Sequence, residues 1–391
     1  MSELIVQTVE FTLEKHPNAD TLSIAHIKGW QCVVRTEDFK NEQFGVYIPL
    51  DSICKTTNPL LNFLEGKKVK TIKLRGVISQ GVLLPLSQVV NYLGFTPKLD
   101  ENIKDHLGIV KYEAPLKMLN FYSGHVDTFH DQPEFFNMYT DIENWNNYPN
   151  IISDGEPVRI TEKLHGTNAR FGISSNFDIF VGSHKRTLRI EPYLSKKTLE
   201  KWNHRSVWTK FLDFLLSNKP TMTIPPDNIW IRVYRNYHIE AFLSFVQEAV
   251  YHRVKDDCME KSEIKSVVVY GEIVGEGIQD LKYGHSDLGF YVFGITVDGK
   301  YLSPKDVDAL LLKYNSFNNA VKINSVPVLF EGAFSKELLK LADGKDIPSN
   351  SHVREGIVIE ALTNTFSKSL GRVVLKKVSD AYYIRKNSQD N

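Results

Sequence analysis

The stretch Ile160-Thr161-Glu162-Lys163-Leu164-His165-Gly166-Thr167-Asn168 decides how the rest of the chain is interpreted. An apolar, β-favouring run leads into it, and an alternating segment at residues 169–173 leads out of it. This pattern predicts a strand, a tight turn and a second strand. Gly166 gives the turn the backbone freedom that is needed beside a bound ligand. Lys163 then stands at the end of the first strand, where its amine can face a pocket.

A lysine in this position has two interpretations. A lysine amine attacks an electrophile only when it is neutral, so a nucleophilic Lys163 needs burial or a neighbouring cation to lower its pKa from about 10.4. In the other interpretation, a lysine before a tight turn is a solvated surface residue. Polar residues further along the chain favour the first interpretation.

Length and composition set the broad class of protein. The chain has 391 residues, which predicts two domains, because a single hydrophobic core rarely grows to that size. Lysine plus arginine and aspartate plus glutamate each total 47, so the formal net charge is zero. This balance neither proposes nor excludes a nucleic-acid partner, since a basic groove can lie on a neutral protein.

Cysteine usage and the N-terminus indicate where the protein works. Cys32, Cys54 and Cys258 are far apart and form no CxxC pair, so neither a disulfide framework nor a cysteine zinc site is expected. The N-terminus lacks a basic segment followed by an apolar one, and no run of about 18 apolar residues occurs. We expect an intracellular protein, cytoplasmic or nuclear, with no signal peptide, no transmembrane segment and no membrane partner.

The first third of the chain predicts a small β-barrel. Residues 3–13 and 21–50 alternate in the way that strands do, with turn formers at residues 16–20 between them. A second strand-rich block at residues 69–86 carries glycines at which a barrel can bend. Short strands at this spacing predict an OB-type module over residues 1–115.

Two segments sharpen the prediction for this module. The runs His16-Pro17-Asn18-Ala19-Asp20-Thr21-Leu22 and Leu74-Arg75-Gly76-Val77-Ile78-Ser79-Gln80-Gly81-Val82-Leu83-Leu84 resemble the tRNA-binding OB modules attached to some aminoacyl-tRNA synthetases. In the alternative interpretation, their glycines and apolar residues only build the barrel. OB folds bind nucleic-acid strands through basic faces. The predicted phosphate contacts are Lys70, Lys73, Arg75 and Ser79.

The remainder of the chain predicts a connector and a second domain. Residues 116–150 are irregular, aromatic and rich in Asn and Asp, so we interpret them as a connector that packs on a domain at residues 151–391. Helical spacing at residues 194–217 and 228–252 predicts a helical insert at about 190–262. The aromatic residues of these helices are expected to be core rather than base-stacking platforms.

Charged residues inside apolar strands point to the chemistry of the second domain. Glu272, Glu355 and Lys376 each lie in or at the end of a strand-like apolar run. Burying a charge is costly unless it is paired or bound to a cation. A shared pocket that holds metal and phosphate would explain all three, whereas an exposed strand edge is the alternative for any single one. A strand predicted at residues 179–183 ends in a basic cluster and can neighbour the strands around Lys163 in one sheet.

The order of these motifs resembles the covalent nucleotidyltransferase superfamily of ATP-dependent ligases and capping enzymes, with motifs I, Ia, III, IIIa, IV and V in sequence over residues 160–380. Residues 162–168 resemble motif I of the second RNA ligase family and of the editing ligases. An OB module in front of the ligase domain resembles the fifth RNA ligase family, whose members repair or seal broken RNA. That family more often has Asp at the position of His165. Its motif V commonly separates two basic residues, so the adjacent Lys376 and Lys377 leave the second phosphate-binding lysine open.

The resemblance implies the fold class and the reaction. It implies an α+β protein, with an N-terminal OB-fold β-barrel followed by an adenylyltransferase (ATP-grasp-like ligase) domain of antiparallel sheets flanked by helices. It implies an ATP-dependent RNA ligase that uses Mg²⁺ or Mn²⁺. Lys163 attacks the α-phosphorus of ATP and releases pyrophosphate, the adenylate moves to a 5′-phosphate at an RNA break, and a 3′-hydroxyl then expels AMP. The expected partner is nicked or broken RNA, and a monomer is expected.

The resemblance also implies roles for single residues. Lys376 would offset charge on the α-phosphate, Phe293 would stack on the adenine, and Glu162 would accept from its amino group. His165 would meet the leaving pyrophosphate or stabilise the turn. The implied metal ligands are Glu355 and Glu272. The implied ATP or AMP contacts are Glu162, Leu164, His165, Asn168, Arg186, Glu272, Phe293, Lys376 and Lys377, and the implied RNA contacts are Lys70, Lys73, Arg75 and Lys185.

Other classes of protein remain as alternatives. DNA ligases and capping enzymes of this superfamily normally place an OB domain after motif V, whereas only residues 379–391 follow it here. A polynucleotide ligase that acts on DNA-containing nicks is retained as an alternative. A non-catalytic RNA-binding protein with a degenerate ligase domain would be expected to lack the lysine or a carboxylate, and Lys163, Glu272 and Glu355 are all present.

Overall fold

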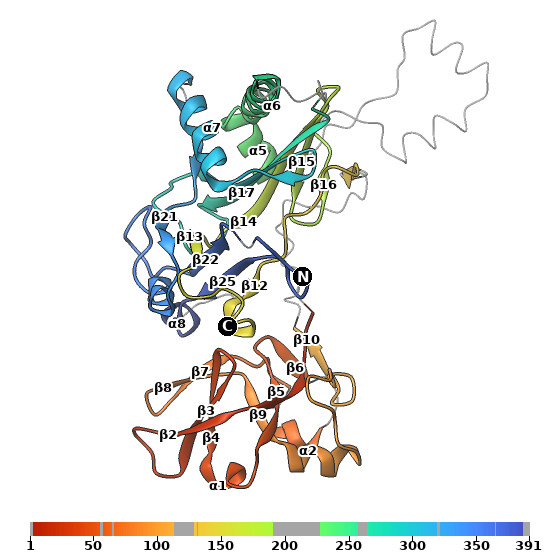
Figure 1. Cartoon of the computed structure of the whole chain (residues 1–391), viewed down its shortest axis with the longest axis vertical. Coiled ribbons are helices and arrows are strands. Elements are labelled where there is room, and N and C mark those ends of the chain that lie inside the picture. Colours follow the sequence, from red (N-terminus) through yellow and green to blue (C-terminus); the bar gives the residue numbers. More distant parts are fainter. Residues whose placement is uncertain are drawn as a thin grey trace, which may run out of the picture. The chain divides into compact units, whose positions relative to one another are not determined.

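The computed structural model describes residues 3–54, 58–64, 66–112, 129–130, 132–190, 227–256, 264–318, 321–363 and 365–385. The chain forms two compact units, each built from separate segments (Figure 1). Unit 1 consists of Met1–Leu116, Thr140–Lys163 and Pro327–Asn391, and unit 2 consists of Lys117–Tyr139 and Leu164–Val326. The peptide bond between Lys163 and Leu164 therefore joins the units in the middle of the predicted motif I. The predicted division into a module, a connector and a ligase domain stays a prediction.

Unit 1 begins with a small β-structure, here called the N-terminal module (residues 3–112). One sheet has the order β1–β5–β9 and another the order β2–β3–β4, and the two share a buried core that includes Val9, Ala25 and Tyr47. The hairpin β7–β8 and the pair β10–β6 complete it. The elements are β1 (Gln7–Glu10), β2 (Thr12–Lys15), β3 (Leu22–Ile27), β4 (Trp30–Arg35), α1 (Thr36–Phe39), β5 (Phe44–Ile48), β6 (Ser52–Cys54), η1 (Pro59–Leu64), β7 (Thr71–Leu74), β8 (Val77–Gln80), β9 (Val82–Pro85), α2 (Leu86–Leu93) and β10 (Ile109–Lys111).

The rest of unit 1 is a five-stranded sheet in the order β12–β25–β22–β13–β21. Consecutive side chains of a strand point to opposite faces, and one face of this sheet packs on a core that contains Ile160, Ile359 and Leu375. The opposite face does not point into this core, so polar side chains can lie on it. The elements are β12 (Glu143–Asn144), η3 (Trp145–Asn147), β13 (Pro157–Lys163), β21 (Val328–Ala333), η4 (Lys336–Ala342), β22 (Gly356–Ala361), β23 (Phe366–Ser367), β24 (Gly371–Arg372), β25 (Val374–Val378) and α8 (Asp380–Tyr383).

Unit 2 is organised by an eight-stranded sheet in the order β11–β16–β15–β14–β17–β18–β19, with β20 paired to β18. Three helices pack on the sheet (Figure 1) and bury a core that includes Phe171, Phe242 and Val292. The elements are β11 (Phe129–His130), β14 (Thr167–Ser174), β15 (Ile179–Ser183), β16 (Thr187–Leu188), α5 (Ile229–Asn236), α6 (Ile239–Asp256), β17 (Ser266–Gly275), β18 (Leu288–Val297), β19 (Lys300–Tyr301), α7 (Pro304–Phe317) and β20 (Asn324–Ser325).

The observed elements agree with the predicted α+β class, a β-rich N-terminal module followed by mainly antiparallel sheets with helices. The strand predicted at residues 179–183 is β15, and it pairs with β14, the strand after the turn, whereas β13, which carries Lys163, lies in the five-stranded sheet. The prediction of one continuous helix at residues 228–252 is wrong, because this segment forms two helices. It is interrupted between α5 and α6, where His238 has a left-handed φ of 50° that a continuous helix does not allow. The predicted helix at residues 194–217 and the residue Cys258 lie outside the described residues.

The connector predicted at residues 116–150 is divided between the two units. In unit 2, Arg170 is fully buried and donates to Phe136 O at 2.5 Å and to Gln132 Oε1 at 2.9 Å. The Phe136 ring fills the space beside Gly172, where a Cβ would lie 2.8 Å from that ring. The segment 132–139 is therefore an integral part of unit 2. In the part of the chain that the structure describes, no helix is long and apolar enough to cross a membrane.

Candidate active site

Lys163 is the last residue of β13, and its ammonium meets a buried carboxylate. Lys163 Nζ donates to Glu355 Oε1 at 2.5 Å. The Lys163 side chain retains 26% of its exposure, whereas that of Glu355 retains 6%. The pairing follows from the sheet register, because Lys163 lies opposite Gly356, the residue after Glu355. A Cβ on Gly356 would lie 2.2 Å from Lys377 O, so the glycine permits β22 to approach β25 closely.

The two adjacent lysines of β25 have different surroundings. Lys376 lies opposite Val358 and Lys377 lies opposite Ile357, so their side chains leave opposite faces of the sheet. Burial lowers the pKa of Lys376, the charge of Lys163 lowers it further, and Glu355 opposes both effects. Lys377 instead donates to Asn146 Oδ1 at 2.7 Å. Lys376, and not Lys377, therefore shares the surroundings of Lys163 and Glu355.

Glu162 points away from that cluster, to the core face of β13, because it is the neighbour of Lys163 in an extended strand. Its side chain is 1% exposed, and its Oε2 accepts from Ile347 N at 2.8 Å. Burial raises the pKa of Glu162 to about 7, although Ile347 N–H and the charge of Arg354 counteract the rise. These contacts give Glu162 a structural role in unit 1. Its predicted bond to the adenine amino group stays a prediction.

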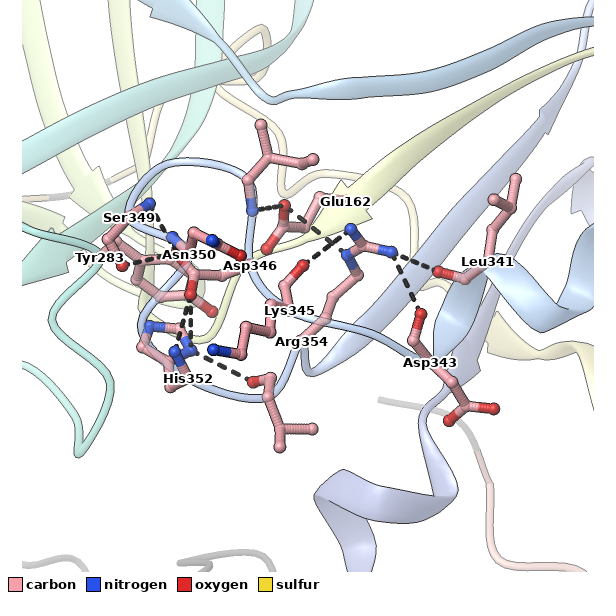
Figure 2. A network of polar contacts seen from close by, with 12 residues as sticks. Glu162, Tyr283, Leu341, Asp343, Lys345, Asp346, Ser349, Asn350, His352 and Arg354 are labelled. Atoms are coloured by element: carbon pink, nitrogen blue, oxygen red, sulfur yellow. Dashed lines mark hydrogen bonds and ion pairs between the residues drawn. The ribbon is translucent and has the colours of Figure 1, made fainter.

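Arg354 and Asp346 organise the loop that Glu162 contacts (Figure 2). Arg354 Nε lies 3.7 Å from Glu162 Oε2, and its two terminal nitrogens donate to Leu341 O at 2.5 Å and to Lys345 O at 2.8 Å. The buried carboxylate of Asp346 accepts from backbone N–H groups of residues 349–352 and from a serine hydroxyl. The network fixes the backbone that leads into Glu355.

The turn after Lys163 belongs to unit 2, where a separate set of contacts holds it. His165 N donates to Tyr283 Oη at 2.7 Å, and His165 Nε2 lies 3.1 Å from Asp280 Oδ1. Gly166 N donates to Glu272 Oε1 at 3.0 Å. A Cβ on Gly166 would lie 2.2 Å from Ile273 O, so the glycine is required by close packing on β17. Glu272 thus has one oxygen committed to the turn.

Three more predicted nucleotide contacts lie in or beside this unit's sheet. Asn168 lies opposite Glu272 in the β14–β17 pair, and its Oδ1 is buried with no hydrogen-bond partner among the described residues. Phe293 in β18 is half-buried and packs edge-on against Tyr139, with ring centroids 4.7 Å apart. Leu164 is 4% exposed. Their contacts with a nucleotide stay predictions.

The basic residues predicted to bind RNA are exposed. Lys185 and Arg186 lie in the turn between β15 and β16. Lys70, Lys73 and Arg75 are exposed on and beside the hairpin β7–β8. The phosphate contact predicted for Ser79 is wrong, because this residue is 3% exposed and its hydroxyl accepts from Val33 N at 3.0 Å.

The hairpin β7–β8 also explains why two distant segments of the module resemble one known motif. Asn18 Nδ2 donates to Arg75 O at 2.9 Å, and His16 Nε2 lies 3.3 Å from Leu74 O. Arg75 has a left-handed φ of 45°. The segment at residues 16–20 therefore supports the tip of the hairpin and presents Arg75 to solvent.

The sequence did not identify four residues that organise these segments: Asp346 and Arg354 within unit 1, and Asp280 and Tyr283 within unit 2. Arg354 directly precedes the predicted metal ligand Glu355, so its position in the sequence could have indicated its role. Asp346 precedes Ser349 and Ser351, a spacing typical of an Asx-type loop. Asp280 and Tyr283 lie in the loop between β17 and β18, and no local pattern relates them to His165.

Comparison with known proteins places these observations in a family. A family model described as RNA ligase matches residues 156–378, and a model described as an OB-fold domain matches residues 5–86. Similar solved structures include a point mutant of the Naegleria gruberi RNA ligase with ATP and Mn, at 22% identity and a TM-score of 0.71, covering 98% of this chain and 100% of that chain. Another mutant with AMP and Mn has 22% identity, a TM-score of 0.72 and coverage of 99% and 100%. The same ligase with PPi has 23% identity, a TM-score of 0.69 and coverage of 97% and 98%. At these identities the similarity establishes the fold.

Proposed function

The chain belongs to the RNA ligase family, and from this premise we propose that it joins a 3′-hydroxyl RNA end to a 5′-phosphate end with ATP. The proposed intermediates are lysyl-AMP on Lys163 and an adenylylated RNA end. RNA repair is the proposed setting. The observation that carries the proposal is the cluster at the end of β13, in which Lys163 Nζ lies 2.5 Å from Glu355 Oε1 and shares its surroundings with Lys376.

The proposed first step forms a nitrogen–phosphorus bond. The neutral Lys163 amine attacks the α-phosphorus of ATP, the bond from that phosphorus to the oxygen bridging to the β-phosphorus breaks, and pyrophosphate leaves with the electron pair. After the attack, the nitrogen loses one proton to solvent or to a carboxylate and becomes a neutral phosphoramidate. Lys376 supports this step in two ways. The Lys376 ammonium disfavours a second positive charge on Lys163, which favours the neutral amine. It can also offset the negative charge that develops on the α-phosphate.

The two later steps follow the same logic. A 5′-phosphate oxygen of the RNA attacks the phosphorus of lysyl-AMP, which returns Lys163 to its amine form and leaves an adenylylated 5′ end. The 3′-hydroxyl then loses its proton and attacks the RNA 5′-phosphorus, and AMP leaves. His165 and Arg186 are proposed to contact phosphate or the RNA end, as implied by the family resemblance. The contact of the His165 ring with Asp280 and the bond from the backbone N–H of His165 to Tyr283 hold this residue in place, which supports the role.

A divalent cation fits the donors that are present. In the part of the chain that the structure describes, no three His, Cys, Asp or Glu side chains lie close enough together to hold a metal ion by themselves. Glu355 in unit 1 and Glu272 in unit 2 each carry the hard carboxylate oxygens that Mg²⁺ and Mn²⁺ prefer, and Mg²⁺ is usually bound by one or two carboxylates together with phosphate oxygens and water. When bound, the cation would offset the charge of the triphosphate. The Naegleria ligase structures with ATP or AMP and Mn support ATP and a divalent metal as the cofactors.

The experiment that tests the proposal separates its steps. Full-length protein is incubated with α-labelled ATP and Mg²⁺ or Mn²⁺, and the adduct is located by mass spectrometry. We expect AMP on Lys163 and none in Lys163→Ala. A nicked RNA duplex with 3′-hydroxyl and 5′-phosphate ends should then be sealed, and a duplex with a DNA 5′-phosphate strand tests the alternative substrate. RNA binding without any adduct would support the alternative, a non-catalytic RNA-binding protein. A monomer in the cytoplasm or nucleus stays a prediction.

A further inference from the structure

Unit 1 contains an open groove that none of the residues proposed for catalysis lines. It encloses about 550 Å³, which is within the usual range of roughly 300–1,000 Å³ for ligand sites. Lys28 and Gly29 of the N-terminal module line it, together with residues from the segment 145–151 and with Lys336 and Ser369. We call it the module groove. Segments that lie far apart in the sequence therefore build one concave surface.

Specific contacts fix the walls of the module groove. Gly29 N donates to Asn146 O at 2.9 Å, and Trp30 Nε1 donates to Asn147 Oδ1 at 2.8 Å. A Cβ on Gly29 would lie 2.7 Å from Asn146 Cα, so only glycine permits this approach. Asn144 Oδ1 in turn accepts from Asn146 N at 3.0 Å and caps the short helix η3. These contacts hold the segments that line the groove against one another.

The charges of the lining residues favour an anionic ligand. Lys28 and Lys336 are both exposed, and the lining residues that the structure describes include no aspartate or glutamate. Lys28 Nζ lies 3.9 Å from Asp100 Oδ1, but both side chains are exposed, at 44% and 66%, so this ion pair is weak. Exposed amides of Asn147 and Asn150 add neutral hydrogen-bonding groups. Phosphate oxygens are the ligand type that such a surface satisfies.

An aromatic ring adds a second element of recognition. Tyr148 lines the groove and is half-buried, with its ring against the core of the five-stranded sheet. Burial raises the pKa of its hydroxyl, and the charge of Glu143 raises it further, so Tyr148 stays a neutral phenol. A neutral, supported ring in a groove that also carries lysines is a combination with which proteins bind single-stranded nucleic acid, because every base has a face that can stack.

We infer that the module groove binds a single-stranded RNA segment, with phosphates on Lys28 and Lys336 and a base stacked on Tyr148. The inference rests on the proposed function, since an RNA ligase must hold strands near the break. A strand is the proposed occupant because the groove combines two exposed lysines with a supported aromatic ring, which is how proteins hold single-stranded nucleic acid without reading its sequence. The exposed basic residues of hairpin β7–β8 would then be a separate contact.

The first test removes charge from the groove in the full-length protein. The groove variant carries Lys28→Ser and Lys336→Ser. The control variant carries Lys40→Ser and Lys340→Ser, which remove the same charge from the N-terminal module and from η4 at positions that do not line the groove. Fluorescence anisotropy measures binding of a fluorescein-labelled single-stranded RNA across a salt series. The salt slope of log K should fall by about 1.4 in the groove variant, at about 0.7 per phosphate contact. It should be unchanged in the control variant.

The second test addresses stacking. Tyr148→Phe should bind this RNA like the wild type, whereas Tyr148→Leu, which keeps apolar packing, should bind roughly fivefold more weakly or worse. Thermal unfolding shows whether each variant is folded. If Tyr148→Leu is unfolded, the lysine pair alone decides the matter.

Each outcome supports or overturns the inference. Equal salt slopes for the groove and control variants overturn it, and so does a raised KM for ATP in lysyl-AMP formation with unchanged RNA binding, which would indicate a nucleotide site. Loss of RNA binding in the groove variant with normal lysyl-AMP formation supports it. If the wild type binds RNA through the groove but never forms lysyl-AMP, the proposed function fails while the groove assignment stands.

Discussion

Glu162 should give the unfolding free energy a pH dependence that one substitution can isolate. Burial raises the pKa of this carboxyl from its usual 4.5 to about 7. The folded protein therefore holds the proton more tightly than the unfolded chain does. The contribution of Glu162 to stability is complete below pH 4.5 and is lost as the pH rises through about 7. At 1.36 kcal/mol per pH unit, the loss is about 3 kcal/mol.

The variant Glu162→Gln removes the titration and keeps an oxygen that can accept from Ile347 N. Arg354 keeps its bonds to Leu341 O and Lys345 O, so the loop of Figure 2 retains its anchor. The quantity to follow is the difference in the free energy of unfolding between wild type and variant. We expect this difference, wild type minus variant, to fall by about 3 kcal/mol between pH 5 and pH 8. Denaturant unfolding at several pH values measures it. Glu337→Gln, at an exposed site, is the control. Parallel curves for wild type and Glu162→Gln would refute the reasoning.

Three further substitutions test the candidate site. Gly166→Ala places a Cβ 2.2 Å from Ile273 O, so thermal unfolding should show a loss on the order of 1–3 kcal/mol and lysyl-AMP formation should fall with it; wild-type stability would contradict the close packing. Lys376→Ala should slow lysyl-AMP formation roughly hundredfold, whereas Lys377→Ala should mainly lower stability, and equal rates would contradict their placement on opposite faces. Asp280→Asn removes the carboxylate beside His165 and should lower kcat for lysyl-AMP formation on the order of tenfold at an unchanged melting temperature, which a purely structural role would not produce.

The strands of the site could be predicted from local pattern because they are long and strongly apolar. The apolar run before Lys163 matches β13, whose side chains alternate between the two faces of the sheet, and the apolar run that contains Glu272 matches β17. The same alternation separates Glu162 from Lys163, and Lys376 from Lys377, onto opposite faces. The prediction grouped all four residues around the nucleotide because it followed the family motif rather than the strand geometry.

The remaining contacts could not be predicted because they depend on register and on loop conformation. Which lysine of β25 faces Lys163 is set by the pairing of Val358 with Lys376, and nothing in either strand alone specifies that register. The contact between Asp280 and His165 depends on the path of the loop between β17 and β18. The break at His238 depends on a single left-handed residue in an otherwise helical pattern. Local sequence carries no signal for these contacts.

The structure changes what removal of the N-terminal module should do. A protein that starts near Asp141 would lose the segment 132–139, which Arg170 anchors in unit 2, so the truncation has to begin near residue 113. All groups proposed to react with ATP lie after residue 150, and this shorter protein should still form lysyl-AMP. Its sealing of a nicked RNA duplex should be weak, because the module carries exposed basic residues and one wall of the module groove.

Its stability should fall as well, because at least three hydrogen bonds between described residues tie the module to the rest of unit 1. They run from Gly29 N to Asn146 O, from Trp30 Nε1 to Asn147 Oδ1 and from Gln80 Nε2 to Asp380 Oδ1. At about 1 kcal/mol each, their loss costs about 3 kcal/mol, which thermal unfolding can measure. Trp30→Phe with Gln80→Ala in the full-length protein removes two of these bonds and leaves the basic residues in place. If that variant melts lower but seals RNA normally, the module contributes stability and RNA binding separately; a truncated protein with unchanged melting temperature and sealing would contradict both roles.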